Sequence, residues 1–434
     1  MKQENISMFL DQMRKVFCER KLNALGKSLG YAKRERKITP ARLVLAGIKA
    51  FSCSKVETIA DVQRAFNAMF NEGVAYKPFH NQLAKAKFGE FMREVTNLVF
   101  EHIMVQTLGF NNGKNMLAEF NSIYIQDGTS FGVKDSLREV FPGRFTTIKP
   151  AAVELHVTYD LCHEMPVAIS LTPDKDSEKA ELPEAKDLCH CLILADCGYP
   201  NTEYFTELQL NKGSYLMRMN KAINPFIIDR RKREIKKHTE RPLKRVKQNL
   251  SKKKVHDFDV VFRDDKTNTT HRLIVRWNNE KKEYMHLITN LPRERYTAEA
   301  ILDIYRLRWQ IELAFKEWKS YANLHAFDTS NESIVEGFIW FAIIAALIKR
   351  FMAHTTQVVK KVETSTRKVA MCVIHVLPEI FKCLAKKRRG ALEKVFCTAI
   401  EYLSRNALRA HPKRDREKGR LKIGLEPVFH GLKN

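Results

Sequence analysis

The strongest constraint on the fold of this 434-residue chain is a short, nearly continuous apolar run at residues 191–195. A run of this length and character is typical of a β-strand that is buried on both faces. Patterns of strands and helices surround it in the order strand, strand, strand, helix, strand, helix, strand; they cover 122–126, 153–160, 165–172, 180–188, 191–195, 202–210 and 214–219. This order predicts an α/β fold in which a mixed five-stranded sheet packs against helices.

An aspartate stands at the end of two of these expected strands, with a glycine close behind it. Asp127 opens the sequence Asp-Gly-Thr, and Asp196 opens the sequence Asp-Cys-Gly-Tyr. Either aspartate alone can be a turn residue or the N-cap of a helix. As a pair at strand ends, they are candidates for carboxylates that bind a metal ion together.

A third acid lies in residues 305–319, which contain no Gly or Pro and therefore predict a helix. At about 100° per residue, one arc of this helix carries a phenol, a carboxylate and three cations: Tyr305, Glu312, Arg308, Lys316 and Lys319. A separate apolar arc should face a core; it holds Leu307, Ile311, Ala314, Phe315 and Trp318. The remaining side should face water and holds Arg306, Gln310 and Glu317. An ordinary solvated helix with ion pairs, such as Glu312 with Lys316, would give a similar arc of charges.

The spacing within this helix is more specific than its charges. The pattern consists of Tyr, two residues, Arg, three residues, Glu, six residues and Lys. It resembles the YREK signature of bacterial insertion-sequence transposases of the DDE class, which have a ribonuclease-H-like fold. Asp127 and Asp196 resemble the first and second catalytic aspartates of that family, in the right order before Glu312. The resemblance is strong over residues 120–330, and in the flanking regions it is one of layout only.

The resemblance implies metal-dependent cleavage of DNA by three acids. Breaking a phosphodiester bond without a covalent intermediate needs an activated nucleophile. It also needs the negative charge on the attacking and leaving oxygens to be neutralised, and two divalent ions can do both. Such hard ions prefer carboxylate oxygens. We therefore expect two Mg²⁺ ions, replaceable by Mn²⁺, with Asp127 bridging both and with Asp196 and Glu312 each holding one.

The other residues of the signature are expected to hold DNA. Arg308 would bind a phosphate by a bidentate fork and Lys319 as a point charge, while Tyr305 would donate a hydrogen bond to a phosphate or stack on a base. Lys316 shares this face but is not part of the signature. In the relatives these residues also help to stabilise a base flipped out of a hairpin intermediate. Two aromatic residues here could receive such a base: Trp277 and Tyr284.

The patterns divide the chain into five parts. A helical, DNA-binding N-terminal domain (1–115) and a helical C-terminal region (331–434), expected to provide the dimer contact, flank a ribonuclease-H-like catalytic core. The core is divided into residues 116–220 and 293–330 by a basic, β-rich insertion at 221–292.

Three segments outside the core are candidates for DNA contact. The helical patterns 58–71 and 78–87, separated by a turn with Gly73, resemble a helix-turn-helix, although an ordinary helical hairpin fits equally well. The basic run 33–37 adds phosphate-binding charge. In the insertion, 230–254 carries thirteen Lys or Arg against two Glu, and we expect it to follow the DNA backbone. Three strand patterns come after it, at 257–262, 272–277 and 284–289.

The overall charge favours a polyanionic partner, and the resemblance implies that this partner is double-stranded DNA. The chain has 75 Lys and Arg against 50 Asp and Glu, a formal charge of +25. The longest apolar run, 337–348, is shorter than the roughly 20 residues of a bilayer span, so we expect a buried helix and no membrane. Nine cysteines without paired spacing favour a reducing cytosol, and the resemblance implies the bacterial cytoplasm with its nucleoid. The cluster Cys189, His190, Cys191 and Cys197 lacks a second ligand pair, which disfavours zinc.

The expected function is therefore cut-and-paste transposition. A homodimer on DNA would bind the terminal inverted repeats of its own element, cleave them and join the 3′ ends to target DNA. A ribonuclease-H-like nuclease that cuts without strand transfer is one alternative. A non-catalytic DNA-binding regulator descended from a transposase is another, although such a protein has no need of all three acids.

Overall fold

The computed structural model describes residues 2–34, 36–104, 109–111, 117, 119–162, 165–228, 241–263, 269–324, 327–410 and 426–428. Much of the basic segment expected to follow DNA, residues 230–240, lies outside the described residues.

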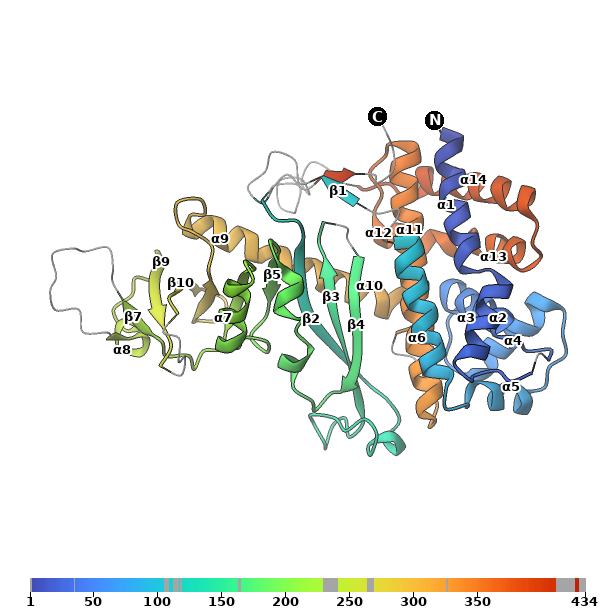
Figure 1. Ribbon diagram of the computed structural model, residues 1–434, viewed down its shortest axis with the longest axis horizontal. Coiled ribbons are helices and arrows are strands. Elements are labelled where there is room, and N and C mark those ends of the chain that lie inside the picture. The colour runs from blue at the N-terminus through green and yellow to red at the C-terminus, as the bar shows by residue number, and fades with distance from the viewer. Residues whose placement is uncertain are drawn as a thin grey trace.

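A ten-stranded mixed sheet runs from the middle of the molecule to one end, and helices fill the other end (Figure 1). Its strand order is β4-β3-β2-β5-β6-β11-β10-β9-β7-β8. β2 pairs antiparallel with β3 and parallel with β5, and β5 pairs parallel with β6, so the predicted mixed sheet is confirmed. The strands are β2 (Ile123–Gly132), β3 (Ala152–Asp160), β4 (Met165–Pro173), β5 (Leu192–Ala195), β6 (Ser214–Met219), β7 (Phe226–Ile228), β8 (Arg241–Pro242), β9 (Val255–Val261), β10 (His271–Asn278) and β11 (Glu283–Thr289). A separate two-stranded sheet is formed by β1 (Gly109–Asn111) and β12 (Glu426–Val428).

The sheet does not stop at the five strands that the sequence predicts. β11, from the expected insertion, pairs antiparallel with β6, and β10 and β9 follow it. The three strand patterns of the insertion are thus present, but they extend the core sheet and do not form a separate one. Without β11, the N–H and C=O groups on that side of β6 would have no sheet partner, and pairing with a neighbouring strand satisfies them.

Two local expectations differ from the structure. β2 continues past Asp127 to Gly132, because each of these residues pairs with β3, so Asp127 lies inside the strand and not at its end. Residues 180–188 do not form an α-helix. They contribute to two 3-10 turns, η3 (Glu178–Glu181) and η4 (Ala185–Leu188), because Pro183 between them has no N–H to continue a helix.

Helices from the two ends of the chain share one apolar core. α11 (Glu332–Lys360) is buried along most of its length and packs against α3, α6 and α14. The N-terminal helices are α1 (Lys2–Val16), α2 (Glu19–Ser28), α3 (Pro40–Cys53), α4 (Ile59–Phe70), α5 (Tyr76–Leu83) and α6 (Phe88–Val99). The C-terminal helices after α11 are α12 (Thr366–Cys372), α13 (Leu377–Ala385) and α14 (Arg389–Asn406). Among the described helices, none has the unbroken apolar length that a membrane crossing requires.

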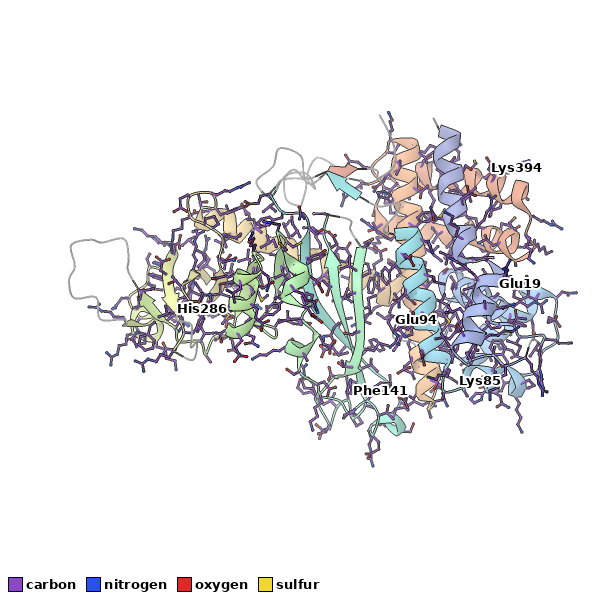
Figure 2. All side chains as sticks on the ribbon, viewed as in Figure 1. Glu19, Lys85, Glu94, Phe141, His286 and Lys394 are labelled. Atoms are coloured by element: carbon purple, nitrogen blue, oxygen red, sulfur yellow. The ribbon has the colours of Figure 1, made fainter. Side chains whose placement is uncertain are left out.

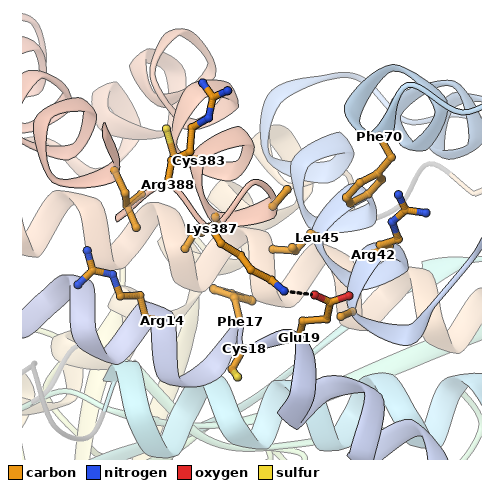
Figure 3. A pocket seen from close by; sticks show the side chains of 14 residues that line it. Arg14, Phe17, Cys18, Glu19, Arg42, Leu45, Phe70, Cys383, Lys387 and Arg388 are labelled. Atoms are coloured by element: carbon orange, nitrogen blue, oxygen red, sulfur yellow. Dashed lines mark ion pairs between the residues drawn. The ribbon is translucent and has the colours of Figure 1, made fainter. Parts of the chain in front are cut away.

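Specific contacts hold these two groups of helices together. A Cβ at Gly337 of α11 would collide with the ring of Phe88 on α6, so the helices approach closely only because this residue is glycine. Glu19 and Lys387 form an ion pair of 2.7 Å beside a cavity of about 450 Å³ that residues of α1, α3 and α13 line (Figure 3). The helical end of the molecule is therefore built from both termini of the chain.

The helix pair considered for DNA binding is formed by α4 and α5. Thr58 and Asp61 form a capping box at the start of α4, and Asn71, in the left-handed conformation, ends it. Phe79 of α5 packs on Phe66 of α4, with 5.6 Å between the ring centroids. α5 ends at Leu83 and is shorter than the expected helix 78–87. This geometry fits a helix-turn-helix and an ordinary hairpin alike.

Candidate active site

Residues 305–319 are not the single helix that the sequence predicts, because a 3-10 turn separates the last residue of one helix from the next helix. α9 (Ala298–Tyr305) leads into the 3-10 turn η5 (Arg306–Arg308), and α10 (Trp309–Tyr321) follows. The backbone stays in the right-handed helical region through the turn, so the predicted arcs persist. The large side chains of the apolar arc are buried: Leu307, Ile311, Phe315 and Trp318.

Glu317 departs from this pattern. It was expected to face water, but it is largely enclosed because α12 packs beside it. Burial raises the pKa of Glu317, and a hydrogen bond to Thr366 partly offsets that effect.

The three acids converge on one side chain, Arg308. Its Nη1 donates to Oδ2 of Asp127 at 2.6 Å. Its Nη2 donates to Oε1 of Glu312 and lies 3.8 Å from Oδ2 of Asp196. Only 12% of the Arg308 side chain is exposed. The structure therefore brings together Asp127, Asp196 and Glu312, and it places Arg308 among them, where the sequence suggested a contact with DNA phosphate.

This convergence affects the ionisation of Asp127. Burial, together with repulsion from Asp196 and Glu312, raises the pKa of Asp127 to about 7. The Arg308 guanidinium and the N–H of Gly128, which donates to Oδ1 at 3.0 Å, favour the charged form but do not outweigh burial. Three carboxylates surround one guanidinium, so negative charge exceeds positive charge around Arg308.

The remaining residues of the signature differ in their contacts. The hydroxyl of Tyr305 donates to Oδ1 of Asp196 at 3.3 Å. Nζ of Lys319 donates to the main-chain oxygen of Ser130, on β2, at 3.0 Å. Lys316 is exposed. Tyr305 and Lys319 thus support the acids and the strand that carries Asp127, whereas Lys316 faces solvent, where a ligand can reach it.

Sequence reasoning missed Arg218 of β6. Its Nη1 lies 3.8 Å from Oδ1 of Asp196, and its Nη2 lies 3.6 Å from Oε1 of Glu283 on β11. The register explains this position: Ala195 is opposite Met217 in the parallel β5–β6 pair, so the next residue on each strand is Asp196 and Arg218. Finding Arg218 from sequence would have required that register in advance.

The two aromatic residues considered as base receivers pack against each other. The rings of Trp277 and Tyr284 meet edge to face at 4.8 Å, and Nζ of Lys252 lies 4.3 Å from the Trp277 centroid. His286, labelled in Figure 2, lies on β11 of the same sheet. Burial, and after it the charge of Lys247, lowers the pKa of His286 to about 4. Positive charge therefore surrounds these strands, and the role of the two aromatic residues stays a prediction.

A second basic region lies on the N-terminal helices. A cavity of about 1110 Å³ separates the loop after α2 from α5. Nζ of Lys85 donates to the main-chain oxygen of Tyr31 at 3.1 Å, and burial lowers the pKa of Lys85. The basic residues that line the cavity are Lys33, Arg34, Arg36, Lys37, Lys85 and Lys87.

The donor set at the acids suits a hard divalent cation. Asp127, Asp196 and Glu312 offer carboxylate oxygens only, which Mg²⁺ and Mn²⁺ prefer. Over the described part of the chain, no three Asp, Glu, His or Cys side chains stand in a ready metal-binding arrangement. Here the guanidinium of Arg308 lies between the carboxylates. Burial, and after it repulsion from the other two carboxylates, raises the pKa of Asp127, so further positive charge at this place would be stabilising.

Known proteins resemble this chain over most of its length. A family model described as "Transposase DDE domain" matches residues 119–348. The transposase for insertion sequence element IS231C of Bacillus thuringiensis subsp. berliner is 24% identical, covering 94% of this chain and 93% of that protein. The transposase for IS231D of B. thuringiensis subsp. finitimus is 22% identical with the same coverage. A piggyBac transposase synaptic complex with hairpin DNA aligns at 11% identity over 93% of this chain and 86% of that chain, with a TM-score of 0.45, too low to establish a shared fold.

Proposed function

The chain belongs to the family of transposases with a DDE domain and is a DNA transposase of an insertion sequence, and we propose that it works by cut-and-paste. In this proposal it binds the terminal inverted repeats of its element, cleaves the DNA there and joins the 3′ ends to a target. The core that carries the acids would be of the ribonuclease-H-like type.

Asp127, Asp196 and Glu312 are the proposed catalytic acids. The observation that supports this assignment most is that one guanidinium, that of Arg308, contacts all three carboxylates. Asp127 and Arg308 are 181 residues apart in the chain, so the convergence is a property of the tertiary fold. Two divalent ions bound by these acids would activate the attacking water and neutralise charge on the reacting phosphate.

The side chains around the acids have separate roles in this proposal. Arg308 offsets the charge of the carboxylates when DNA is absent, and its planar fork suits a phosphate when DNA is bound. Tyr305 orients Asp196 through its hydroxyl. Lys319 holds β2 at Ser130, and Lys316, which is exposed, contacts the DNA backbone.

Two basic surfaces would guide the DNA. The proposed DNA-binding N-terminal domain would face the terminal repeat with α5 and with the cavity that is lined by Lys33, Arg34, Arg36, Lys37 and Lys85. Arg218, beside Asp196, would continue the contact from the acids toward β9–β11. The C-terminal helices are the proposed contact of a homodimer that holds two DNA ends.

The test is incubation of the full-length protein with Mg²⁺ or Mn²⁺ and DNA that carries the ends of its own element. We expect cleaved ends and joined strand-transfer products. Asp196→Ala should lose both by several orders of magnitude while it keeps DNA binding. Asp303→Ala, which removes a partly exposed aspartate of α9 that pairs with Arg306 of η5, should retain activity.

Three outcomes would contradict the proposal in different ways. Cleavage without joined products would favour a nuclease that lacks strand transfer. DNA binding without any metal-dependent cleavage would favour a regulator. Equal cleavage by the wild type and Asp196→Ala would show that these acids are not the catalytic ones.

A further inference from the structure

A glutamate packs behind the glycine that follows Asp127. Gly128 is the next residue of β2, so its side-chain position points to the opposite face of the sheet. A Cβ there would stand 2.8 Å from Oε1 of Glu154 on β3. Glu154 is buried, with 5% exposed. Glycine at 128 therefore lets this carboxylate lie directly against the backbone beside Asp127.

A matching contact lies beside Asp196. A Cβ at Gly198, two residues further on, would collide with the carboxylate of Glu178 on η3. The next residue, Tyr199, reaches back toward the first contact, because its hydroxyl lies 3.3 Å from Nδ1 of His156 on β3. The backbone after each aspartate is thus covered by a glutamate, and the two places are linked through Tyr199.

One arginine joins the two glutamates. Nη2 of Arg144 lies 3.3 Å from Oε2 of Glu154 and 3.1 Å from Oε1 of Glu178. The backbone N–H of Arg144 donates to Oδ2 of Asp174 at 2.9 Å, and its Nε donates to the main-chain oxygen of Asp174. We call Arg144, Glu154 and Glu178 the rear clamp. It connects the backbone beside Asp127 with the backbone beside Asp196 without involving Arg308.

The pairing of β2 with β5 does not extend to the two aspartates. The parallel pairing of β2 with β5 ends at Gln126 and Ala195, immediately before the two aspartates. Ladder hydrogen bonds between these strands therefore do not fix the distance from one aspartate to the other. A pair of carboxylates that shares metal ions must be held within about 0.5 Å of its working geometry.

We propose that the rear clamp sets the spacing of Asp127 and Asp196 and that Arg144, Glu154 and Glu178 are positioning residues for divalent metal binding. This inference rests on the proposed function, in which these two aspartates hold metal ions. Arg144 acts by keeping both glutamates against the glycine backbone, since the two carboxylates would otherwise repel each other.

The direct test is binding of Mn²⁺ to the full-length protein without DNA, by titration calorimetry and by electron paramagnetic resonance of the bound ion. Arg144→Ala should weaken Mn²⁺ binding by about 10- to 100-fold, as the loss of an outer partner of metal ligands does. The sign discriminates between explanations. If Arg144 acted only as a nearby positive charge, its removal would tighten the binding of a cation.

Arg295→Ala is the matched control. The side chain of Arg295 is 46% exposed, against 44% for Arg144, and it also pairs with a glutamate, Glu119. The Arg295→Ala variant should bind Mn²⁺ with the affinity of the wild type. A melting temperature of Arg144→Ala well below that of Arg295→Ala would mark the clamp as a general structural element and overturn its positioning role.

A second set of variants tests the contact at Gly198. Gly198→Ala displaces the Glu178 carboxylate without deleting it, and the fold should tolerate this because the carboxylate ends a flexible side chain. Glu178→Ala removes the same contact. Each variant should bind Mn²⁺ more weakly than the wild type. The double variant should bind Mn²⁺ no more weakly than whichever single variant has the lower affinity, because both changes break the same contact. Additive losses would overturn the clamp.

Asp196→Ala separates failure of this inference from failure of the proposed function. If it loses Mn²⁺ binding while Arg144→Ala and Glu178→Ala bind normally, the clamp is wrong and the metal site stands. If Asp196→Ala binds Mn²⁺ as the wild type does, the proposed metal site is itself wrong, and the clamp with it.

Discussion

Replacing Asp127 by Asn should stabilise the metal-free protein at about pH 8, although it removes the partner of a 2.6 Å ion pair with Arg308. Burial and the nearby carboxylates raise the pKa of Asp127 from 3.8 to about 7. The folded chain therefore holds this proton more tightly than the unfolded chain does. The stability that Asp127 contributes is complete below about pH 4 and is lost as the pH rises to about 7.

The size of the effect follows from the shift. A rise of about three pKa units corresponds to about 4 kcal/mol of unfolding free energy above pH 7. This is an upper bound, because the side chains of Asp196 and Glu312 are 29% and 33% exposed and water screens part of their repulsion. Asn cannot ionise, so the variant retains at about pH 8 the stability that the wild type has only near pH 4.

Asp257→Asn is the matched control with the opposite sign. The Asp257 side chain is 17% exposed, against 16% for Asp127, and it also pairs with arginines, Arg272 and Arg293. Burial raises the pKa of Asp257, but hydrogen bonds from the two arginines outweigh burial and lower it. The contribution of Asp257 to the free energy of unfolding is therefore present at neutral pH and is lost on acidification. At about pH 8, Asp257→Asn should melt below the wild type.

The assay is thermal unfolding in the presence of a chelator, at about pH 4 and about pH 8. Asp127→Asn should match the wild type at the lower pH and exceed it at the higher one. Added Mn²⁺ should then raise the melting temperature of the wild type more than that of the variant. If Asp127→Asn melts below the wild type at about pH 8, Asp127 is an ordinary ion-pair partner and the reasoning from crowded carboxylates is refuted.

Three further predictions concern helices, two of them beside the acids and one in the helical end of the molecule. Tyr305→Phe removes the hydrogen bond to Asp196 and should lower the single-turnover cleavage rate about tenfold or more, with an unchanged melting temperature. Lys316→Ala should weaken DNA binding and reduce the slope of log affinity against log salt by about one, measured by fluorescence anisotropy. Gly47→Ala should destabilise the helical end by about 1–3 kcal/mol in denaturant unfolding, because its methyl group would collide with the Phe341 ring.

Much of the fold could be inferred from short-range patterns. The apolar run at 191–195 corresponds to a buried strand, β5, and the apolar arc of 305–319 is buried as expected. These predictions hold because a continuous apolar run and a helical apolar period both report burial directly from neighbouring residues. The three acids were selected from their place beside the strands and from the resemblance of the helix spacing to the signature, and their catalytic role stays a prediction.

Other features could not be read from neighbouring residues. Whether β11 joins β6 depends on two strands that start 69 residues apart finding a common register. Glu317 has a water-facing place in the helix pattern, and only the packing of α12 encloses it. Arg218 and Arg144 carry no motif, and they matter because of the strands that stand beside them.

The sequence alone indicated the strands of the core sheet, three acids that are candidates for catalysis and the family that the chain resembles. Only the tertiary structure decided that Arg308 lies among those acids, that the sheet continues into the insertion and that two glutamates stand behind the aspartates. The physical reason is range. Periodicity acts over a few residues, whereas the energy of a charge depends on every group packed within several ångströms, from any part of the chain.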